Sequence, residues 1–312
     1  MVQDHKSGRK ALLHIAVCVC TYKRPEWLRQ LLLRLIGLDR SDAFTYSLVV
    51  VDNDRERSAE AVVAEVREGS RLDIRYVVEP MKNISRARNK AVRASEGELI
   101  VFIDDDEYPG HERWLIDLYN AFKEFRADAV IGPLAPHYLF KPSLWMEKGG
   151  FFSYRKEFET GRPLAWHECA TSNTLLSREI FRRGILFDEA FGSTGGEDSK
   201  LFWDAAAAGY RFIACRTALV YERVPEHRGT LFWILARAFR TGGIFAFIAM
   251  ENRSWVRRFW LFSLVLCRTL AAVLTLPVSA LRGRDVAART AVQAAANAGQ
   301  AWGVCGRLVE GY

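Results

Sequence analysis

Short apolar runs alternate with helical patterns along the first third of the chain. The apolar runs, which have the length and composition of buried strands, occupy residues 12–20, 46–51, 74–78 and 99–103. Apolar side chains at helical spacing lie between them, at residues 25–37, 59–66 and 85–94. Strands that alternate with helices predict an α/β fold with a mostly parallel central sheet, covered by helices on both faces.

The pattern loosens after Pro109. We expect a helix at 114–125, short strands at 129–132 and 170–176, a helix capped by Ser177, and a helix at 199–208. Residues 137–168 are rich in aromatic side chains but have no clear period. Their Trp145, Tyr154 and Trp166 could stack on ligand rings, but such residues are as often part of a core.

Polar clusters follow three of the predicted strands, at 21–24, 52–54 and 104–107. In open α/β sheets, ligands bind outside the carboxyl ends of the strands. One binding site could therefore gather all three clusters.

The last cluster consists of four consecutive carboxylates, Asp104, Asp105, Asp106 and Glu107, and we expect Pro109 to stop further strand pairing. Like charges at one strand end repel one another, so a buried cluster needs a compensating cation. A divalent metal such as Mg²⁺ or Mn²⁺ would supply it, and such a metal takes further ligands from water and substrate phosphates. The alternative is a solvated acidic loop after an ordinary strand.

Two further segments carry candidate site residues. At the start of the third predicted helix, Asn83 or Ser85 could be a simple N-cap, or Arg86 or Arg88 and the helix N-terminus could face a diphosphate. The glycine-rich loop 187–198 delivers Glu197 and Asp198 to the start of a helix, where an ionised carboxylate base is stabilised. A capping aspartate on a surface helix is the alternative there.

Composition narrows the possibilities only a little. The net charge of +7 is compatible with nucleic acid, anionic lipid or a phosphorylated substrate. The six cysteines are scattered in apolar surroundings, so we expect reduced core residues rather than a zinc site or a disulfide framework. Lys6, Arg9 and Lys10 precede a short first apolar run without a cleavage site, so we expect no signal peptide and a cytosolic chain.

Taken together, residues 14–225 resemble a family 2 glycosyltransferase with the GT-A fold, an inverting and nonprocessive enzyme similar to those of bacterial exopolysaccharide (succinoglycan-type) assembly. The resemblance rests on the order and spacing of five motifs: residues 17–25, 49–53, 83–89, the D-x-D motif at 104–106, and 196–198. The Q-x-x-R-W motif of processive synthases is absent, so we expect one sugar to be added per encounter.

The resemblance implies roles for individual residues. The nucleotide-sugar donor would be bound by Thr21, Tyr22, Arg24, Asp52, Asn53, Asn83, Arg88, Asp104 and Asp105. Within this set, Asp52 would contact the base and Arg88 would stand near the diphosphate. Asp106, with Asp104, would ligate Mn²⁺ or Mg²⁺. Asp198 would be the catalytic base, with Glu197 as the weaker candidate, and the basic segment 237–242 and His227 could meet phosphate.

The C-terminal third has a different character. Residues 259–281 are almost wholly apolar and have the length of a membrane span, although Arg268 lies in the middle. On a helical wheel, a basic stripe falls within about 40° of one line. Its members are Arg253, Arg257, Arg268, Thr275 and Arg282. We favour peripheral or monotopic membrane attachment over a soluble hairpin with 285–308, and over a true span.

These observations predict two regions, a catalytic domain at 1–225 and a helical, membrane-associated region at 226–312. The predicted activity is metal-dependent, inverting transfer of one sugar from a nucleoside-diphosphate sugar such as UDP-glucose. The acceptor would be a growing or polyprenyl-diphosphate-linked saccharide at the cytoplasmic face of the cell membrane. A nucleotidyltransferase is the enzymatic alternative, but residues 21–25 lack its glycine-rich signature. A basic nucleic-acid-binding module would not need the acidic cluster, so we expect no nucleic-acid partner.

Overall fold

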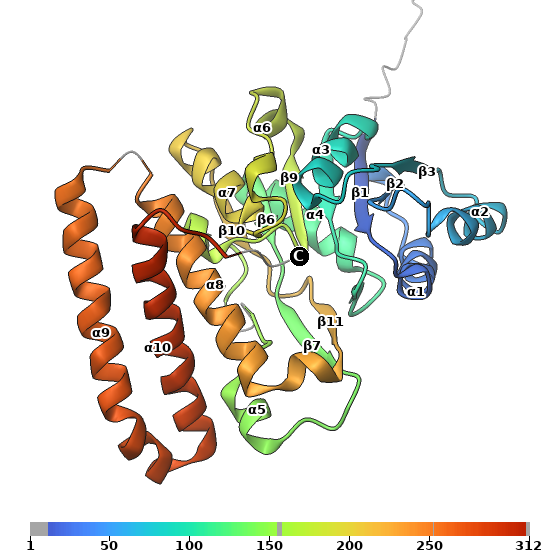
Figure 1. Cartoon of the computed structure of the whole chain (residues 1–312). Coiled ribbons are helices and arrows are strands. Elements are labelled where there is room, and N and C mark those ends of the chain that lie inside the picture. Colours follow the sequence, from blue (N-terminus) through green and yellow to red (C-terminus); the bar gives the residue numbers. More distant parts are fainter. Residues whose placement is uncertain (1–11, 155–157, 252, 310–312) are drawn as a thin grey trace, which may run out of the picture.

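The computed structural model describes residues 12–154, 158–251 and 253–309. The predicted leader with Lys6, Arg9 and Lys10 lies outside the described residues. The described chain forms an α/β unit followed by a layer of long helices (Figure 1).

Within these residues the main sheet has eight strands in the order β3-β2-β1-β4-β9-β6-β10-β8. The strands are β1 (Leu13–Thr21), β2 (Phe44–Asp52), β3 (Ile74–Val78), β4 (Leu99–Phe102), β6 (Ala129–Ile131), β8 (Pro163–Leu164), β9 (Thr174–Ser177) and β10 (Phe212–Ala214). The first four are parallel, as predicted. Strand β9 runs antiparallel to both β4 and β6, so the complete sheet is mixed.

Helices cover both faces of this sheet, as the apolar runs predicted. In β1, the side chains of Ile15, Val17 and Val19 face a core shared with α1 (Pro25–Ile36), α2 (Glu60–Glu68) and α4 (Trp114–Phe125). The alternate residues of β1 face a second core, shared with α3 (Ile84–Ala94), α6 (Arg178–Arg182) and α7 (Glu197–Ala207). Period-two alternation with both sets apolar is what a strand buried on both faces requires.

A second sheet was not anticipated. It has three strands in the order β5-β11-β7, formed by β5 (Glu107–Pro109), β11 (Val220–Val224) and β7 (Leu134–Tyr138). The expectation that Pro109 stops strand pairing was wrong, because Pro109 pairs with Val220. Proline is tolerated there because β5 is an edge strand. The same register places Glu107 opposite Glu222.

The region from 139 to 229 contains short elements between these sheets. They are α5 (Leu144–Gly149), the 3-10 turns η1 (Trp166–Glu168), η2 (Glu189–Phe191) and η3 (Glu226–Gly229), and the strands and helices already named. Ser177 caps α6 as predicted, accepting a hydrogen bond from the Glu179 amide at 3.3 Å. The strand expected at 170–176 begins only at Thr174.

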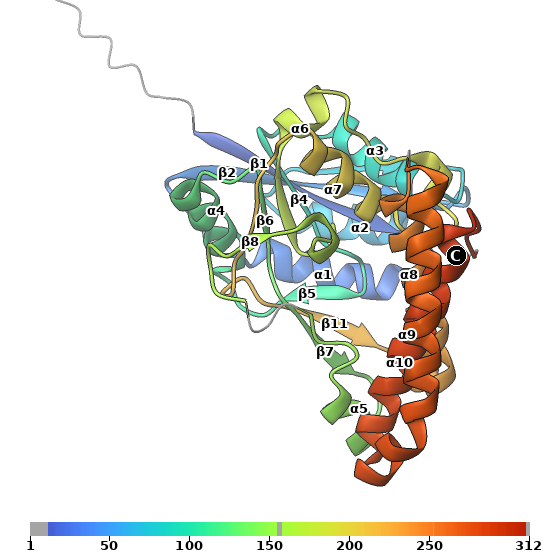
Figure 2. The ribbon, with the colours of Figure 1, turned by 90° about the vertical axis from the view of Figure 1, so that its left-hand side faces the viewer.

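Three helices follow η3: α8 (Leu231–Ala249), α9 (Trp255–Arg282) and α10 (Arg284–Val304). In Figure 1, α10 lies between α8 and α9 and packs on both, and Figure 2 shows the three stacked in one layer beside the sheets. Glycines allow the close approach of α8 and α10, since a Cβ at Gly299 or Gly303 would overlap carbonyl oxygens of Phe239 or Gly243. This is the close backbone packing typical of small-residue helix pairs.

Helix α9 leaves most of its apolar surface uncovered. Both α8 and α9 are long and apolar enough to cross a membrane, but in its most apolar 18-residue window α9 is only 6% buried, against 33% for α8. Trp260, Leu274 and Leu281 are between 72% and 89% exposed. Two cysteines expected in the core, Cys267 on α9 and Cys305, are also exposed, whereas the other four are buried.

We predict that Gly303→Ala destabilises the protein by about 1–3 kcal/mol, because the added methyl group must push α8 away from α10. Alanine is otherwise the better helix former, so a loss would oppose the intrinsic trend. Gly69→Ala is the control, since a Cβ at Gly69 meets no atom closer than 3.9 Å. Denaturant unfolding measures both, and equal stability of the two variants would contradict the packing described here.

Candidate active site

Two adjoining cavities lie at the carboxyl ends of β1, β2 and β4, where the sequence predicted a site. The smaller has a volume of about 240 Å³ and the larger about 790 Å³. They share one set of lining residues, namely Arg24, Arg88, Asp104, Asp106 and Arg228. A ligand in the smaller cavity would therefore meet a ligand in the larger one at these side chains.

The smaller cavity gathers most of the predicted donor-binding residues. Its lining includes Thr21, Tyr22, Arg24, Asn53, Asn83, Arg88, Asp104, Asp105 and Asp106. Lys82 and Arg228, which the sequence analysis did not single out, line it as well.

Asn53 and Asn83 shape the wall of this cavity through the backbone. The Asn53 side chain donates to the carbonyl oxygens of Glu79 and Met81, at 2.9 and 2.6 Å, and accepts from the Asn83 amide at 2.9 Å. The Asn83 side chain caps α3 by accepting from the Arg86 amide at 3.0 Å. The N-cap of α3 is thus Asn83 rather than Ser85, and capping uses the side-chain oxygen of Asn83.

Asp52 requires a correction. It is fully buried, and its carboxylate accepts hydrogen bonds from the amides of Asp54 and Ala59 and from the hydroxyl of Tyr76, at 3.1, 2.7 and 2.9 Å. It is not among the described residues that line either cavity. The expected contact with a nucleotide base is therefore not supported, and Asp52 instead holds the loop after β2.

The acidic strand end is buried, which rules out the alternative of a solvated loop. Arg24 donates to Asp105 at 2.8 Å and to Asp106 at 3.2 Å, and Thr21 donates to Asp105 at 2.8 Å. Burial raises the pKa of Asp105 to about 6, although Arg24 opposes the shift. Arginines therefore supply part of the compensating charge that the sequence analysis assigned to a metal.

Arg88 connects the strand end to the glycine-rich loop. Its buried guanidinium donates to Asp104 at 3.1 Å and also to Glu197 at the start of α7. Burial raises the pKa of Glu197 to about 7, and the charge of Arg88 opposes this shift. Since Glu197 is engaged by Arg88 and buried, it is poorly placed to act on a substrate.

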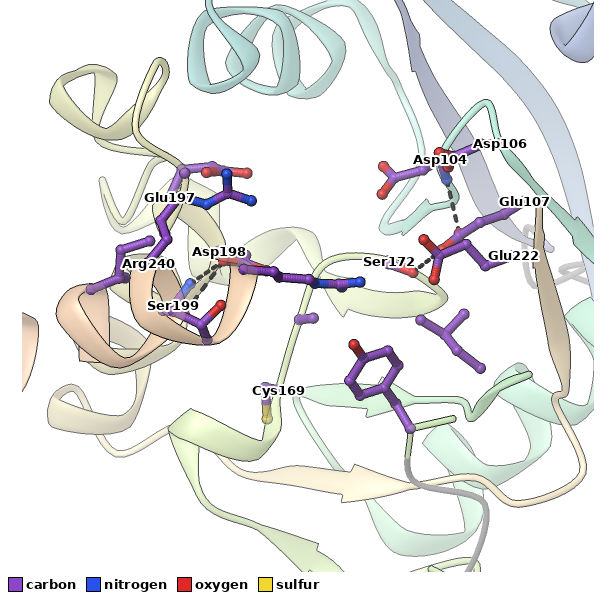
Figure 3. Close-up of a pocket in the computed structure, with 18 of the residues that line it drawn as sticks. Asp104, Asp106, Glu107, Cys169, Ser172, Glu197, Asp198, Ser199, Glu222 and Arg240 are labelled. Atoms are coloured by element: carbon purple, nitrogen blue, oxygen red, sulfur yellow. Dashed lines mark hydrogen bonds between the residues drawn. The ribbon is translucent and has the colours of Figure 1, made fainter. Parts of the chain in front are cut away.

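Asp198 and Glu197 both line the larger cavity, but Asp198 is partly exposed whereas Glu197 is buried. Figure 3 shows Asp198 and Glu197 on one side of the cavity, across from Asp104, Asp106, Glu107 and Glu222. Gly195 and Gly196 both adopt positive φ, which lets the loop turn sharply into α7. Asp198 Oδ1 accepts from the Ser199 amide at 2.7 Å within the first turn of α7. Its position fits a carboxylate base better than that of Glu197.

Residues from distant segments complete the acidic side. Glu107 accepts from the Ser172 hydroxyl and, at 3.0 Å, from the Asp104 amide. Burial raises the pKa values of Glu107, Asp106 and Glu222, and repulsion from neighbouring aspartates adds to each shift. The sequence analysis missed Ser172, Glu222 and Arg228, because no local pattern marks them.

The opposite wall of the larger cavity comes from α8. Arg237, Arg240 and Thr241 line it, as the basic segment 237–242 suggested, and so does His227. Tyr154 also lines it, whereas Trp166 packs against Phe245 with ring centroids 5.2 Å apart. Trp145 packs against Phe151. Of the three aromatic residues singled out, only Tyr154 reaches the cavity.

Comparison with known sequences identifies this architecture. A sequence model described as Glycosyl transferase family 2 matches residues 16–185, more than half of the chain. The chain belongs to glycosyl transferase family 2. It is 36% identical to the succinoglycan biosynthesis protein ExoM of Rhizobium meliloti (strain 1021) over 278 residues, which cover 87% of this chain and 88% of ExoM. The predicted resemblance is confirmed, and the protein is a glycosyltransferase rather than a nucleotidyltransferase or a nucleic-acid-binding module.

Solved structures agree on the fold of this glycosyltransferase. The mannosyltransferase PcManGT from Pyrobaculum calidifontis, solved with GDP-Man and Mn²⁺, is 18% identical with a TM-score of 0.63, covering 94% of this chain and 88% of PcManGT. S. aureus TarS 1-349, solved with UDP-GlcNAc, is 16% identical with a TM-score of 0.55, covering 95% and 93%. These likenesses confirm the predicted GT-A fold.

The carboxylates of Asp104 and Asp106 fit part of a divalent-metal site that substrate phosphates would complete. Among the described residues, no three His, Cys, Asp or Glu side chains form a ready-made metal cage. Asp104 and Asp106 nevertheless present carboxylates to both cavities. A hard divalent cation needs only one or two protein carboxylates when diphosphate oxygens and water complete its shell.

We predict that Glu197→Gln flattens the pH dependence of stability. A carboxyl with a folded pKa of about 7, against 4.5 ordinarily, binds its proton more tightly in the folded state. Stability should therefore fall as pH rises from about 4.5 to 7, and this part of the fall should vanish in the glutamine variant. Thermal unfolding of both proteins across this range measures the difference. Parallel curves would show that Glu197 does not titrate in this way.

Proposed function

We propose that this glycosyltransferase moves one sugar from a nucleoside-diphosphate sugar, UDP-glucose or a similar donor, to a saccharide acceptor with inversion at the anomeric carbon. The observation that carries the proposal is the junction of the two cavities at Asp104, Asp106 and Arg88. The smaller cavity would hold the nucleotide, the junction its diphosphate, and the larger cavity the sugar and the acceptor.

The residues of the junction suit the departure of a nucleoside diphosphate. As the acceptor oxygen bonds to the anomeric carbon, the bond to the diphosphate oxygen breaks and negative charge grows on the leaving group. Arg24 and Arg88 line both cavities, so the positive charge of their guanidinium groups can stabilise nearby phosphate oxygens. Asp106 and Asp104 would hold Mn²⁺ or Mg²⁺, which when bound neutralises diphosphate charge.

Asp198 is the proposed base that takes the proton of the attacking hydroxyl. It lines the larger cavity at the start of α7, where its carboxylate can accept a proton from a bound hydroxyl. Glu197 has a positioning role in this proposal, because its contact with Arg88 fixes the start of α7 relative to the strand end.

The relatives support the classes of donor and product. ExoM is named for succinoglycan biosynthesis, TarS was solved with UDP-GlcNAc, and PcManGT with GDP-Man and Mn²⁺. By extension we propose a surface or exopolysaccharide pathway for this chain. The proposed acceptor is a growing saccharide, carried on a polyprenyl diphosphate.

The exposed surface of α9 supports attachment to the cytoplasmic face of the cell membrane. The helix has four arginines and no acidic residue, and its uncovered apolar side chains include tryptophans near its start. Such a helix can lie in the headgroup region with arginines on lipid phosphates. We keep the proposed division at residue 225, where the strands end, although α8 beyond it contributes to the larger cavity.

We predict that Asp198→Asn lowers sugar transfer by roughly 10²–10⁴-fold, the usual contribution of a positioned base, while UDP binding is unchanged. Transfer of labelled glucose from UDP-glucose into the lipid-extractable saccharides of bacterial membranes measures the first, and calorimetry with UDP and Mn²⁺ the second. Asp204→Asn is the control, because this partly exposed carboxylate on the same helix pairs with Lys200 and lines neither cavity. Retained transfer in Asp198→Asn would remove Asp198 from the mechanism.

Membrane attachment predicts that the double variant Trp260→Glu, Leu274→Glu abolishes co-sedimentation with vesicles containing anionic phospholipid. Two carboxylates on the exposed face of α9 would be repelled by the lipid headgroups and would oppose burial of that face. Leu33→Glu on α1, which is 57% exposed, adds a charge away from α9 and should sediment like the wild type. Unchanged sedimentation of the double variant would exclude attachment through this face.

A further inference from the structure

Arg228 occupies the junction of the two cavities without having been marked by any sequence motif. One terminal nitrogen of its guanidinium lies 3.3 Å from Asp106 Oδ2, and the other lies 3.1 Å from Glu222. Its side chain is only 18% exposed and also lies over the ring of Trp233. Arg228 lines both cavities, a property shared with Arg24 and Arg88.

The backbone holds Arg228 at this point. Its amide donates to the carbonyl oxygen of Pro225 at 3.0 Å, which closes the single turn η3. Gly229 packs so tightly on Phe140 that a Cβ there would overlap the ring. Thr230 then caps α8 by accepting from the Trp233 amide at 3.2 Å. The position of the Cα of Arg228 is therefore fixed on both sides, while its long side chain keeps its rotamer freedom.

Arg228 contacts Asp106, one of the two proposed metal ligands. Arg24 and Arg228 both approach Oδ2 of Asp106, at 3.2 and 3.3 Å. An oxygen shared by two guanidinium groups offers little room for a divalent cation. A cation that binds through this oxygen must therefore displace at least one arginine, and a cation on the other oxygen of Asp106 would be repelled by both guanidinium groups. Arg24 and Arg228 each reach this oxygen through one terminal nitrogen.

We propose that Arg228 is a donor-binding residue that exchanges Asp106 for the diphosphate of the nucleotide sugar when the metal and nucleotide enter. This inference rests on the proposed function. In the exchange, the pair of Asp106 with a guanidinium is replaced by one pair of Asp106 with the metal and one of Arg228 with phosphate. The other terminal nitrogen of Arg228 would stay on Glu222, so the exchange avoids leaving a buried charge unpaired.

The proposed exchange predicts a result that a purely structural role of Arg228 does not. Because Arg228 competes with the metal in the empty site, removing it should strengthen binding of the metal alone. Because Arg228 binds the diphosphate in the loaded site, removing it should weaken binding of the nucleotide. The two affinities should move in opposite directions.

The experiment uses the full chain with Arg228→Gln, Arg228→Lys and the control Arg183→Gln. Arg183 forms an exposed pair with Glu179 outside the cavities. Binding of Mn²⁺ alone is followed by electron paramagnetic resonance, and binding of UDP and UMP with Mn²⁺ by calorimetry. Circular dichroism tests whether each variant is folded. If Arg228→Gln does not fold, Arg228→Lys, which keeps the positive charge, is used in its place.

In Arg228→Gln we expect Mn²⁺ to bind several-fold more tightly and UDP at least about tenfold more weakly, the usual effect of a lost charged hydrogen bond. UMP, which lacks the second phosphate, should lose less, and Arg228→Lys should recover part of the UDP affinity. Unchanged UDP affinity, or weaker binding of both Mn²⁺ and UDP, would overturn the exchange. Failure of the wild type to bind any nucleotide would overturn the proposed function instead.

Discussion

The buried guanidinium of Arg88 is the interaction on which the site depends. It joins Asp104 at the end of β4 to Glu197 at the start of α7, residues that lie 16 and 109 positions from it in the chain. Its face also lies over the ring of Phe187. A buried charge without partners is strongly destabilising, so the fold is stable only when strand end, α3 and glycine-rich loop meet at this point. Arg88 thereby fixes the proposed diphosphate site and the proposed base relative to each other.

Around Arg88, the acidic side of the cavity is a balance of charges contributed by distant segments. The register of β5 and β11 sets Glu107 opposite Glu222, an arrangement of like charges that a sheet ordinarily avoids. Burial and repulsion from Asp104 and Asp106 raise the pKa values of both. The proposed metal and two arginines can compensate the negative charge of these buried carboxylates. A strand pairing that is poor for stability is reasonable as part of a binding site.

Much of the fold could be predicted because it follows from local periodicity. The parallel strands β1 to β4 and their helices are each marked by an apolar run or a helical repeat, and nine of the twelve proposed site residues, those in 21–24, 53, 83–88 and 104–106, line the smaller cavity. Glu197 and Asp198 line the larger cavity, whereas Asp52 lines neither, because backbone amides and Tyr76 engage its carboxylate. The antiparallel direction of strand β9, the second sheet and the role of Arg228 could not be predicted. They arise from pairings between segments far apart in the chain, about which spacing within a segment carries no information.

The helical layer constrains the acceptor if α9 lies on the membrane. Helix α8 forms a wall of the larger cavity, α10 packs on α8, and α9 packs on α10, so the exposed face of α9 is separated from the cavity by two helix packings. Packed helices lie about 8–10 Å apart, which gives roughly 16–20 Å between the axes of α8 and α9. A lipid-linked acceptor must span at least this distance between its anchored end and the hydroxyl near Asp198. On the proposed membrane attachment, that geometry would favour an acceptor already several sugars long over a lipid carrying its first sugar.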